Sequence, residues 1–143
     1  MLLQRRGSTG YLDGYWATAA AGHVEPGESA VDCAVRETRE ELGLTVEPGR
    51  LLPLTTLHRS GEGHADRVDF FFRCTEWNGQ PELQEPQKAT DLHWFPLEAL
   101  PLLVVPHERL VFQGLARDDV TPLLTVGFPP TNGQPVLTVQ GPA

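Results

Sequence analysis

The sequence predicts an α/β fold, in which two helices and several short strands form an α/β/α sandwich around a mixed β-sheet. Three observations support this class. Apolar residues at strand and helix spacing follow one another in the order strand, helix, strands, helix. Hydrophobic residues make up 40% of the 143 residues, which is enough for one ordinary core. No internal repeat or low-complexity tract interrupts the order.

The first predicted helix has clear signals at both ends. Residues 30–42 contain no Gly or Pro, and Ser29 precedes them as an N-cap, with Asp32 three positions later as in a capping box. Gly43 follows where a left-handed residue commonly closes a helix. At 3.6 residues per turn, we expect one face to pack on the core. That face contains Val31, Ala34, Val35, Thr38 and Leu42.

The predicted strands are short and are bounded by turn residues. They lie at residues 2–5, 51–58, 67–74 and 92–95, and residues 15–18 lead into the segment that follows. The second and third of these runs flank a Ser-Gly-Glu-Gly segment, which favours an antiparallel pair. Residues 97–101 indicate one helical turn, and residues 106–117 indicate a second helix with a proline near its start. Leu110, Val111 and Leu115 of this helix would face inward.

The chain divides into a domain at residues 1–119 and a C-terminal tail at residues 120–143. Residues 123–126 and 136–139 of the tail flank a Pro/Asn/Gly turn, which favours a β-hairpin. Such a hairpin would cover an open sheet edge, in its own subunit or in a partner, so a homodimer is one expectation. A loosely ordered C-terminus is the other.

The net charge is −8, and much of it lies in one segment. Residues 22–47 hold seven acidic residues against two arginines, a net charge of −5. Such a surface repels bare polyanions, so we expect no nucleic-acid partner, whereas a bound cation would offset that repulsion for a small anion. Cys33 and Cys74 have no metal-ligand spacing, and the sequence has neither a membrane-length apolar run nor a signal peptide. We therefore expect a cytoplasmic protein without membrane contact.

Acidic side chains gather beside the core face of the first helix. They are Glu37, Glu40 and Glu41, at spacings i, i+3 and i+4. A solvated acidic face is one interpretation. The neighbours favour another, because Glu28 lies just before the helix and Arg36 can pair with Glu40. Gly22 also lets the backbone approach a ligand. Several oxygen ligands beside a phosphate are what Mg²⁺ prefers, so the group is suited to phosphate chemistry.

The stretch from Gly22 to Leu44 has the spacing G-x5-E-x7-R-E-x-x-E-E-x-G-L. This spacing resembles the signature of the Nudix hydrolases, which cleave a diphosphate linked to another moiety. The resemblance extends over roughly residues 2–117, including residues 14–16 and 91–97 on either side of the signature. It implies the Nudix α/β/α sandwich, a pyrophosphohydrolase activity on a nucleotide-type diphosphate, and Mg²⁺ or Mn²⁺ as cofactor.

The resemblance also implies roles for single residues. Those matched to catalysis are Glu37, Glu40, Glu41 and Arg36. Those matched to the metal within the signature are Gly22, Glu28, Glu37, Glu40 and Glu41. Glu40 and Glu41 match the principal ligands, whereas Glu37 matches a ligand or the general base. Arg36 would orient the glutamates, and the backbone carbonyl at or just before Gly22 would join the coordination shell.

Three features depart from the family pattern. Thr38 stands where an aliphatic residue is usual, and its methyl group should still pack. Residues 19–21 are alanines where many relatives have Pro and Gly, which should alter the loop at the metal site. Relatives also have a full strand before the segment that matches residues 2–6. The N-terminal strand therefore looks shortened, unless another segment fills its place.

Further candidates for the site lie outside the signature. Glu85 belongs to a loop that in relatives returns a carboxylate to the metal, and a surface glutamate is the alternative. Arg5 and Arg6 end the first strand and would meet phosphates or form surface salt bridges. The other candidate substrate contacts are Tyr15, Trp16, His23, His58 and Arg59. For the aromatic residues, packing in the core is the competing interpretation.

The sequence does not single out a substrate. The proline and the tyrosine that mark two Nudix subgroups are both absent from residues 57–62. We therefore expect hydrolysis of a (deoxy)nucleoside triphosphate or of a nucleoside diphosphate derivative. The rival expectation is a catalytically silent Nudix fold that binds a nucleotide as a sensor. The chain retains every glutamate of the signature, which favours the enzyme.

Overall fold

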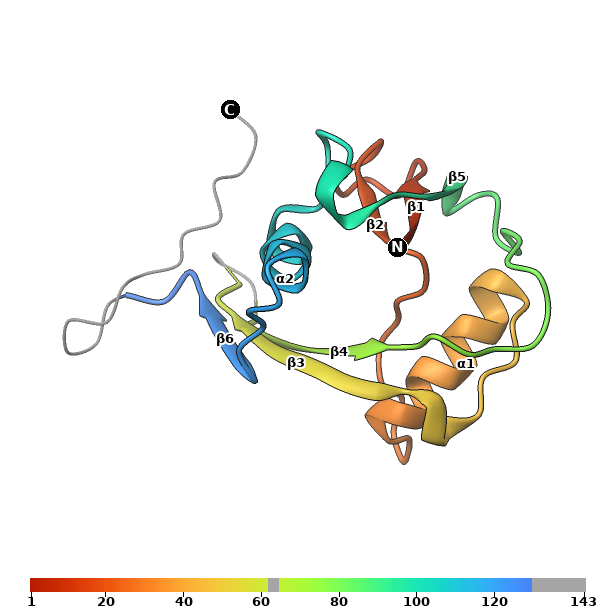
Figure 1. The fold of residues 1–143 in the computed structure, drawn as a ribbon, viewed down its shortest axis with the longest axis horizontal. Coiled ribbons are helices and arrows are strands. Elements are labelled where there is room, and N and C mark those ends of the chain that lie inside the picture. The colour runs from red at the N-terminus through yellow and green to blue at the C-terminus, as the bar shows by residue number, and fades with distance from the viewer. Residues whose placement is uncertain (62–64, 130–143) are drawn as a thin grey trace.

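The protein is described here by a computed structural model that covers residues 1–61 and 65–129 (Figure 1). Its elements are β1 (Leu2–Arg6), β2 (Trp16–Thr18), α1 (Ala30–Leu42), η1 (Pro48–Arg50), β3 (Leu52–Arg59), β4 (Arg67–Arg73), β5 (Ala89–Trp94), η2 (Leu97–Ala99), α2 (Pro106–Ala116) and β6 (Leu123–Val126). The elements η1 and η2 are single 3-10 turns. Each helix and strand predicted between residues 2 and 117 is present close to its predicted bounds.

The strands form two three-stranded sheets. In the first sheet, β1 lies between β2 and β5 and pairs antiparallel with both. In the second sheet, β3 pairs antiparallel with β4 and parallel with β6, so this sheet is mixed. The α/β sandwich with a mixed sheet is confirmed, and the structure adds that its strands are divided between two sheets, on either side of α2 (Figure 1).

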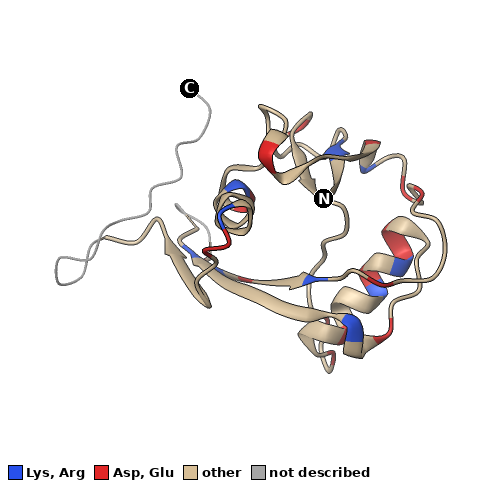
Figure 2. Cartoon of the chain, in the orientation of Figure 1, with Lys and Arg blue, Asp and Glu red and all other residues tan. Residues whose placement is uncertain are grey.

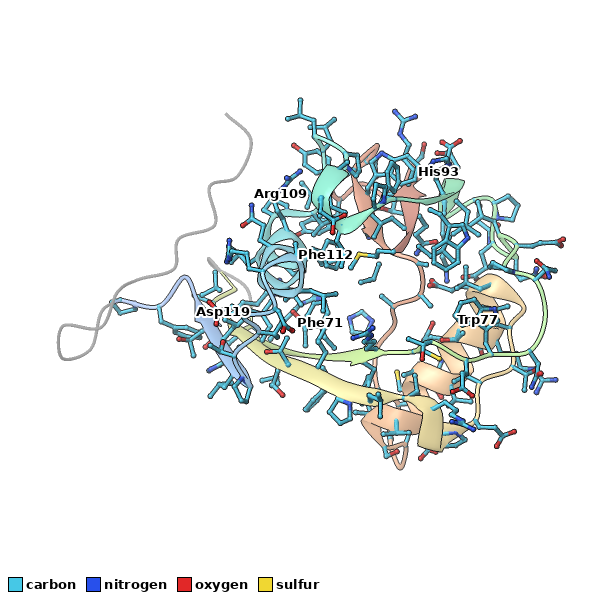
Figure 3. All side chains as sticks on the ribbon, viewed as in Figure 1. Phe71, Trp77, His93, Arg109, Phe112 and Asp119 are labelled. Atoms are coloured by element: carbon cyan, nitrogen blue, oxygen red, sulfur yellow. The ribbon has the colours of Figure 1, made fainter. Side chains whose placement is uncertain are left out.

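Two hydrophobic clusters lie on opposite faces of the first sheet, because successive residues of a strand point to opposite sides. The larger cluster joins Leu3 of β1 to Val104, Val111 and Phe112, with Trp16, Leu54, Phe71, Phe95 and Leu124 packed around them. The smaller joins Ala19, Leu42 and Leu44, with Leu2 and Leu92 against them. Phe71 and Phe112 lie between β4 and α2 in Figure 3. The first sheet is therefore held by α1 on one face and by α2 on the other.

The ends of α1 lie where local sequence signals predict them. Ser29 has an extended backbone, and its hydroxyl accepts the N–H of Asp32 at 3.1 Å. The same hydroxyl donates to the carboxylate of Asp32 at 2.6 Å. Gly43 has a φ of 69°, and its N–H donates to the carbonyl oxygen of Arg39 at 3.0 Å. Both caps use contacts within one turn, which is why they can be predicted from sequence.

The predicted core face of α1 is only partly correct. Leu42 is buried as expected, and Cys33 and Glu41 are buried with it. The other members of the predicted face, Val31, Ala34, Val35 and Thr38, are half-buried. The smaller hydrophobic cluster gathers at the C-terminal end of α1, so the burial is concentrated there.

Helix α2 begins at Pro106, as predicted. Its buried residues are Glu108, Val111, Phe112 and Gly114. Of the residues expected to face inward, Val111 is buried, whereas Leu110 and Leu115 are half-buried. Helical periodicity assigns one inward stripe, but α2 lies between two sheets and is covered on more than one side.

Strand β6 pairs with the edge of β3, with Leu123 opposite Thr56 and Val126 opposite Arg59. The second predicted strand of the tail, residues 136–139, lies outside the described residues. The hairpin, the domain boundary at residue 119 and the homodimer therefore stay predictions. Among the described residues, neither helix is long and apolar enough to cross a membrane.

Candidate functional site

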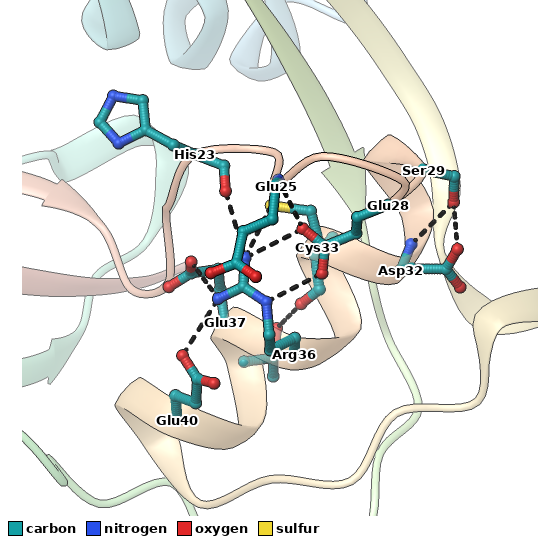
Figure 4. A network of polar contacts seen from close by, with 11 residues as sticks. His23, Glu25, Glu28, Ser29, Asp32, Cys33, Arg36, Glu37 and Glu40 are labelled. Atoms are coloured by element: carbon teal, nitrogen blue, oxygen red, sulfur yellow. Dashed lines mark hydrogen bonds and ion pairs between the residues drawn. The ribbon is translucent and has the colours of Figure 1, made fainter.

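The guanidinium group of Arg36 lies at the centre of a carboxylate cluster on α1 and the turn before it (Figure 4). Its Nε and Nη2 atoms donate to the two carboxylate oxygens of Glu28 at 2.8 and 3.0 Å. Its Nη1 atom donates to Glu37 at 2.6 Å and to Glu40 at 3.1 Å. Nη2 also donates to the carbonyl oxygen of His23 at 3.1 Å. One side chain therefore fixes three carboxylates and the loop before the helix.

The cluster favours its charged form. Hydrogen bonds from Arg36, followed by the backbone N–H of Glu25, lower the pKa of Glu28 to about 2. The same carboxylates raise the pKa of Arg36 above its usual value. Burial, and then the negative charge of Glu28, raise the pKa of the nearby Cys33 thiol. Acidic and basic residues lie close together along α1 in Figure 2, which agrees with this mutual stabilisation.

Gly22 packs directly on the carboxylate of Glu37. A Cβ added at Gly22 would overlap that carboxylate, so a side chain could enter only if Glu37 moved away. The backbone of the preceding residue is held as well, because the N–H of Ala21 donates to Glu41 Oε2 at 2.9 Å. The sequence predicted that Gly22 lets the backbone approach a ligand, which stays a prediction; the group that Gly22 approaches in the structure is the carboxylate of Glu37.

Glu41 is the buried member of the acidic group, with only 7% of the residue exposed. Its carboxylate accepts the N–H of Ala21, and Gln4 of β1 lies at the limit of hydrogen bonding, with Nε2 to Oε2 at 3.5 Å. Burial raises the pKa of Glu41, the N–H of Ala21 lowers it, and the charge of Glu37 raises it again. A nearby cation would relieve both unfavourable effects.

The loop that contains Glu85 meets the C-terminal end of α1. The backbone N–H of Gln84 donates to the carbonyl oxygen of Glu41 at 2.9 Å. The charge of Glu85 contributes to the raised pKa of Glu41, so the two carboxylates are near neighbours. Glu85 itself forms an ion pair with Lys88 at 2.7 Å, which raises the pKa of that lysine. The structure thus brings Glu85 to the side of the cluster where Glu41 lies.

The solvent side of the cluster is an open depression of about 710 Å³. It is lined by Glu28, Asp32, Val35, Arg36, Arg39 and Glu40. Glu40 is half-exposed there, with 54% of its side chain accessible. Glu37 and Glu41 lie on the other side, toward residues 21 and 22. A phosphate compound could therefore approach α1 without a rearrangement of the fold.

The donor set suits a hard divalent cation, because it consists of carboxylate and backbone carbonyl oxygens. In the described part of the chain, however, no three Asp, Glu, His or Cys side chains stand close enough together to hold a metal ion. Arg36 explains this, since its guanidinium occupies the space that Glu28, Glu37 and Glu40 share. The residues fit Mg²⁺ or Mn²⁺ in chemistry, and binding would require carboxylates to turn from Arg36 toward the ion.

The predicted substrate contacts near β1 have other partners. Arg5 donates to the carbonyl oxygen of Gly14 at 3.3 Å and approaches Asp91 at 3.6 Å. Arg6 donates to the carbonyl oxygen of Tyr11 at 2.8 Å. Trp16 packs edge-on against Phe95 of the core, with ring centroids 4.9 Å apart. Tyr15 is half-buried beside it. For Trp16, core packing is what the structure shows.

Of the remaining candidates, His23 contacts Arg36 only through its backbone, and His58 and Arg59 have other partners. His23 gives its carbonyl oxygen to the cluster, while its ring Nε2 lies 3.4 Å from Arg67 of β4. His58 packs on the ring of Phe128, with centroids 4.5 Å apart. Arg59 pairs with Asp69 at 2.6 Å. The role of these residues as substrate contacts stays a prediction.

A buried carboxylate that the sequence analysis did not identify lies in α2. Glu108 is 8% exposed and accepts the backbone N–H of Thr18 at 2.6 Å. Its neighbour His107 has a pKa lowered to about 4, first by burial and then by the charge of Arg59. A glutamate in the first turn of a helix normally indicates a favourable contact with the helix dipole, so its position gave no signal of burial.

The structure is thus an α/β sandwich with clustered glutamates beside a closely packed glycine. The NUDIX domain family model matches residues 1–115. The chain belongs to the NUDIX family, as the signature at residues 22–44 indicated.

Individual relatives agree with this assignment. The chain is 32% identical over 107 residues to the NAD-capped RNA hydrolase NudC of Stutzerimonas stutzeri (strain A1501), covering 72% of this chain and 34% of that protein. It is 32% identical over 105 residues to the isopentenyl-diphosphate Delta-isomerase of Jannaschia sp. (strain CCS1), covering 70% and 58%. The crystal structure of the MutT NUDIX hydrolase from Burkholderia pseudomallei superposes with a TM-score of 0.70 at 26% identity, covering 78% of this chain and 84% of that one.

The two curated relatives differ from the chain in length and from each other in reaction. The chain spans about a third of the hydrolase and somewhat less than three fifths of the isomerase. One is named for the hydrolysis of a capped RNA and the other for an isomerisation of a diphosphate. Because the two names state different reactions, family membership alone does not choose the reaction.

Proposed function

We propose that the chain is a divalent-metal-dependent pyrophosphohydrolase, which cleaves the diphosphate bond of a nucleoside diphosphate derivative or of a (deoxy)nucleoside triphosphate. The observation that carries the proposal is the cluster on α1, in which Arg36 holds Glu28, Glu37 and Glu40 together and Gly22 packs on Glu37. An acidic group ordered by one arginine beside an open depression favours a cation site over a solvated helix face. The hydrolase relatives and the retained signature support the same reading.

The residues that would hold Mg²⁺ or Mn²⁺ are Glu28, Glu37, Glu40, Glu41, Glu85 and the backbone carbonyl at Gly22. When bound, such an ion supplies charge neutralisation and polarises the phosphoryl oxygens. Arg36 would hold the carboxylates that do not face the ion, and it would limit their motion through its ionic hydrogen bonds.

A carboxylate of the cluster would also take the proton from the water that attacks phosphorus. Glu41 has the raised pKa that favours proton uptake, while Glu37 lies against Gly22. The proposal leaves the base to be assigned between these two residues. Substitution of each in turn, with the pH dependence of kcat measured, would distinguish them.

The activity test is a panel of candidate substrates incubated with the full chain and Mg²⁺ or Mn²⁺. It contains nucleoside triphosphates, deoxynucleoside triphosphates, NAD, nucleoside diphosphate sugars and isopentenyl diphosphate. We expect release of phosphate, pyrophosphate or a nucleoside monophosphate from at least one nucleotide, and none in the presence of a chelator. The last substrate tests isomerisation, which one relative is named for.

A matched pair of variants ties the activity to the cluster. Glu41→Gln should abolish the activity with the fold intact, and the exposed Glu98→Gln on η2 should leave it unchanged. A fully active Glu41→Gln would refute the assigned site. If no substrate is hydrolysed while nucleotides still bind, the chain is the silent sensor instead. A homodimer and a cytoplasmic location stay predictions, to be checked by sedimentation and by cell fractionation.

A further inference from the structure

The edge of β2 that faces away from β1 pairs with residues 103–105, which lead into α2. The N–H of Trp16 donates to the carbonyl oxygen of Leu103 at 2.7 Å, and the N–H of Val105 donates to the carbonyl oxygen of Trp16 at 2.8 Å. These bonds form a parallel bridge between Trp16 and Val104. The next acceptor along this ladder would be the carbonyl oxygen of Val105, but that oxygen accepts the N–H of Arg109 at 2.9 Å in the first turn of α2, so the backbone ladder ends there.

Beyond the end of this ladder, the side chain of Glu108 supplies the hydrogen-bond acceptor for β2. Alternate residues of an edge strand direct their N–H groups outward, so the next donor after Trp16 is Thr18. Its N–H donates to Glu108 Oε2 at 2.6 Å, inside a site where Glu108 is almost fully buried. The carboxylate thus occupies the place of a strand carbonyl. Without it, the N–H of Thr18, on a half-buried residue, would lose this acceptor.

The segment after Thr18 leads directly to the carboxylate cluster. Ala19 is buried against Leu42 at the end of α1. Two residues later, the N–H of Ala21 donates to Glu41, and Gly22 packs on Glu37. Residues 19–22 are therefore fixed at two ends, by Glu108 of α2 before them and by the glutamates of α1 after them.

We propose that Glu108 is a positioning residue for the site on α1, which fixes the end of β2 and so sets the path of residues 19–22 against Glu37 and Glu41. Only the expected effect on catalysis rests on the proposed function, because the contact between Glu108 and Thr18 is present whatever the reaction. Glu108 has no role in proton transfer or metal binding in this account. Its effect reaches the site through the backbone between Thr18 and Gly22.

The surroundings of Glu108 make the anchor sensitive to pH. Burial raises its pKa to about 7, while the N–H of Thr18 and the charge of Arg6 on β1 lower it and the charge of Asp69 on β4 raises it. A hydrogen bond from an amide to an ionised carboxylate is stronger than one to a neutral acid. The bond to Thr18 should therefore strengthen as the pH rises through 7.

The direct test is amide hydrogen exchange and amide chemical shifts, measured by NMR on the full chain. Three variants are compared with the wild type: Glu108→Gln, which keeps an acceptor oxygen, Glu108→Leu, which removes it, and the exposed Glu98→Gln as control. In Glu108→Leu, we expect exchange at Thr18 and Ala21 to be faster by about tenfold or more, because both lie on the released segment. Glu108→Gln should stay close to the wild type.

Kinetics with the substrate found in the panel then separate positioning from substrate contact. Glu108→Leu should lower kcat by about tenfold or more and leave KM nearly unchanged, because a displaced catalytic geometry slows the chemical step. Glu108→Gln should restore most of kcat. A rise in KM with an unchanged kcat would overturn the positioning role and indicate a contact with substrate.

A titration of the wild type covers the case in which Glu108→Leu does not fold. The amide proton shifts of Thr18 and Ala21 should both change with a midpoint near pH 7, and both changes should vanish in Glu108→Gln. If neither amide titrates, or if Thr18 titrates and Ala21 does not, the anchor does not reach the site and the inference fails. Because these shifts require no turnover, their outcome is independent of whether the proposed hydrolysis is found.

Discussion

Glu28 beside α1 and Glu108 in α2 are two carboxylates in opposite surroundings. Both oxygens of Glu28 are bonded by Arg36, and its pKa is lowered to about 2. Glu108 is buried, forms no ion pair within the described residues, and has a pKa raised to about 7. The comparison shows that burial and charge pairing act on the same group in opposite directions. Near pH 7, Glu28 is ionised, whereas Glu108 is divided between its ionised and its neutral form.

The two regions also differ in how they are built. The cluster around Arg36 is assembled from residues 22–41, which are near one another along the chain. The contact between Glu108 and Thr18 joins residues 90 positions apart. The first can be formed by one helix and its preceding loop, whereas the second exists only after α2 has packed against β2. Changes in each region should therefore have different consequences.

The largest expected effect comes from the removal of Arg36. Arg36→Ala leaves Glu28, Glu37 and Glu40 without their shared partner, so we expect activity to fall on the order of 10³-fold. Arg36→Lys should recover little, because an ammonium group cannot bond Glu28 through two parallel N–H groups. The control is Arg73→Ala, an exposed arginine at the end of β4 that does not line the depression. Steady-state kinetics check the prediction, and an Arg36→Ala enzyme with wild-type kcat would contradict it.

The pH dependence of stability should have opposite signs for the two carboxylates. The pKa of Glu108 is raised from 4.5 to about 7, so between these pH values the folded protein holds a proton on Glu108 that the unfolded chain has released. The stability that this proton provides is lost as the pH rises through that range. The loss amounts to about 3 kcal/mol between pH 4.5 and 7. Glu108→Gln should remove this slope in denaturant unfolding measured at several pH values.

Glu28 provides the matched comparison. Its pKa is lowered from 4.5 to about 2, so its contribution is present above pH 4.5 and is lost as the pH falls toward 2. Glu28→Gln should reduce only the loss of unfolding free energy at acidic pH. If Glu28→Gln and Glu108→Gln changed the free energy of unfolding over the same pH range, the opposite pKa shifts assigned to Glu28 and Glu108 would be wrong.

Gly22→Ala tests the close approach on which the cluster depends. The new Cβ would overlap the carboxylate of Glu37, so we expect a loss of activity of about 10²-fold as that side chain is displaced. Gly49→Ala is the control, since an added Cβ there meets nothing within 4 Å. Equal activity of the two variants would show that Glu37 can move without consequence.

The smallest effect is expected at an exposed ion pair away from both regions. Arg50 and Glu76 lie 3.1 Å apart, with 57% and 61% of their side chains accessible. Glu76→Gln should change the free energy of unfolding by less than about 0.5 kcal/mol, because solvent screens such pairs. A larger change in thermal unfolding would mean that exposed surface charges also contribute to stability, in addition to the local surroundings of Glu28 and Glu108.

Features that depend on nearby residues were accessible from the sequence. Ser29 and Gly43 satisfy backbone groups within one turn, so both ends of α1 are predicted correctly. The pairing of Arg36 with Glu40 follows from their spacing on a helix. The spacing of the signature identified the family before any fold was known.

Features that depend on packing between distant elements were not accessible. Phe112 is buried because α2 lies between two sheets, and no single stripe in the sequence indicates that arrangement. Glu108 is buried where Thr18 of β2 needs an acceptor, because the carbonyl oxygen of Val105 already accepts the N–H of Arg109. The contacts of Glu28 and Glu37 with Arg36 also depend on rotamers that a spacing pattern does not specify.

The central claim is that the glutamates around Arg36 form a divalent-cation site, and calorimetric titration of Mn²⁺ into the full chain tests it most directly. We expect saturable Mn²⁺ binding in the wild type and in Glu98→Gln. The affinity for Mn²⁺ should fall about tenfold or more in Glu40→Gln and in Glu41→Gln, because each substitution removes an anionic oxygen ligand. Absence of Mn²⁺ binding, or binding that both glutamine variants leave unchanged, would contradict it.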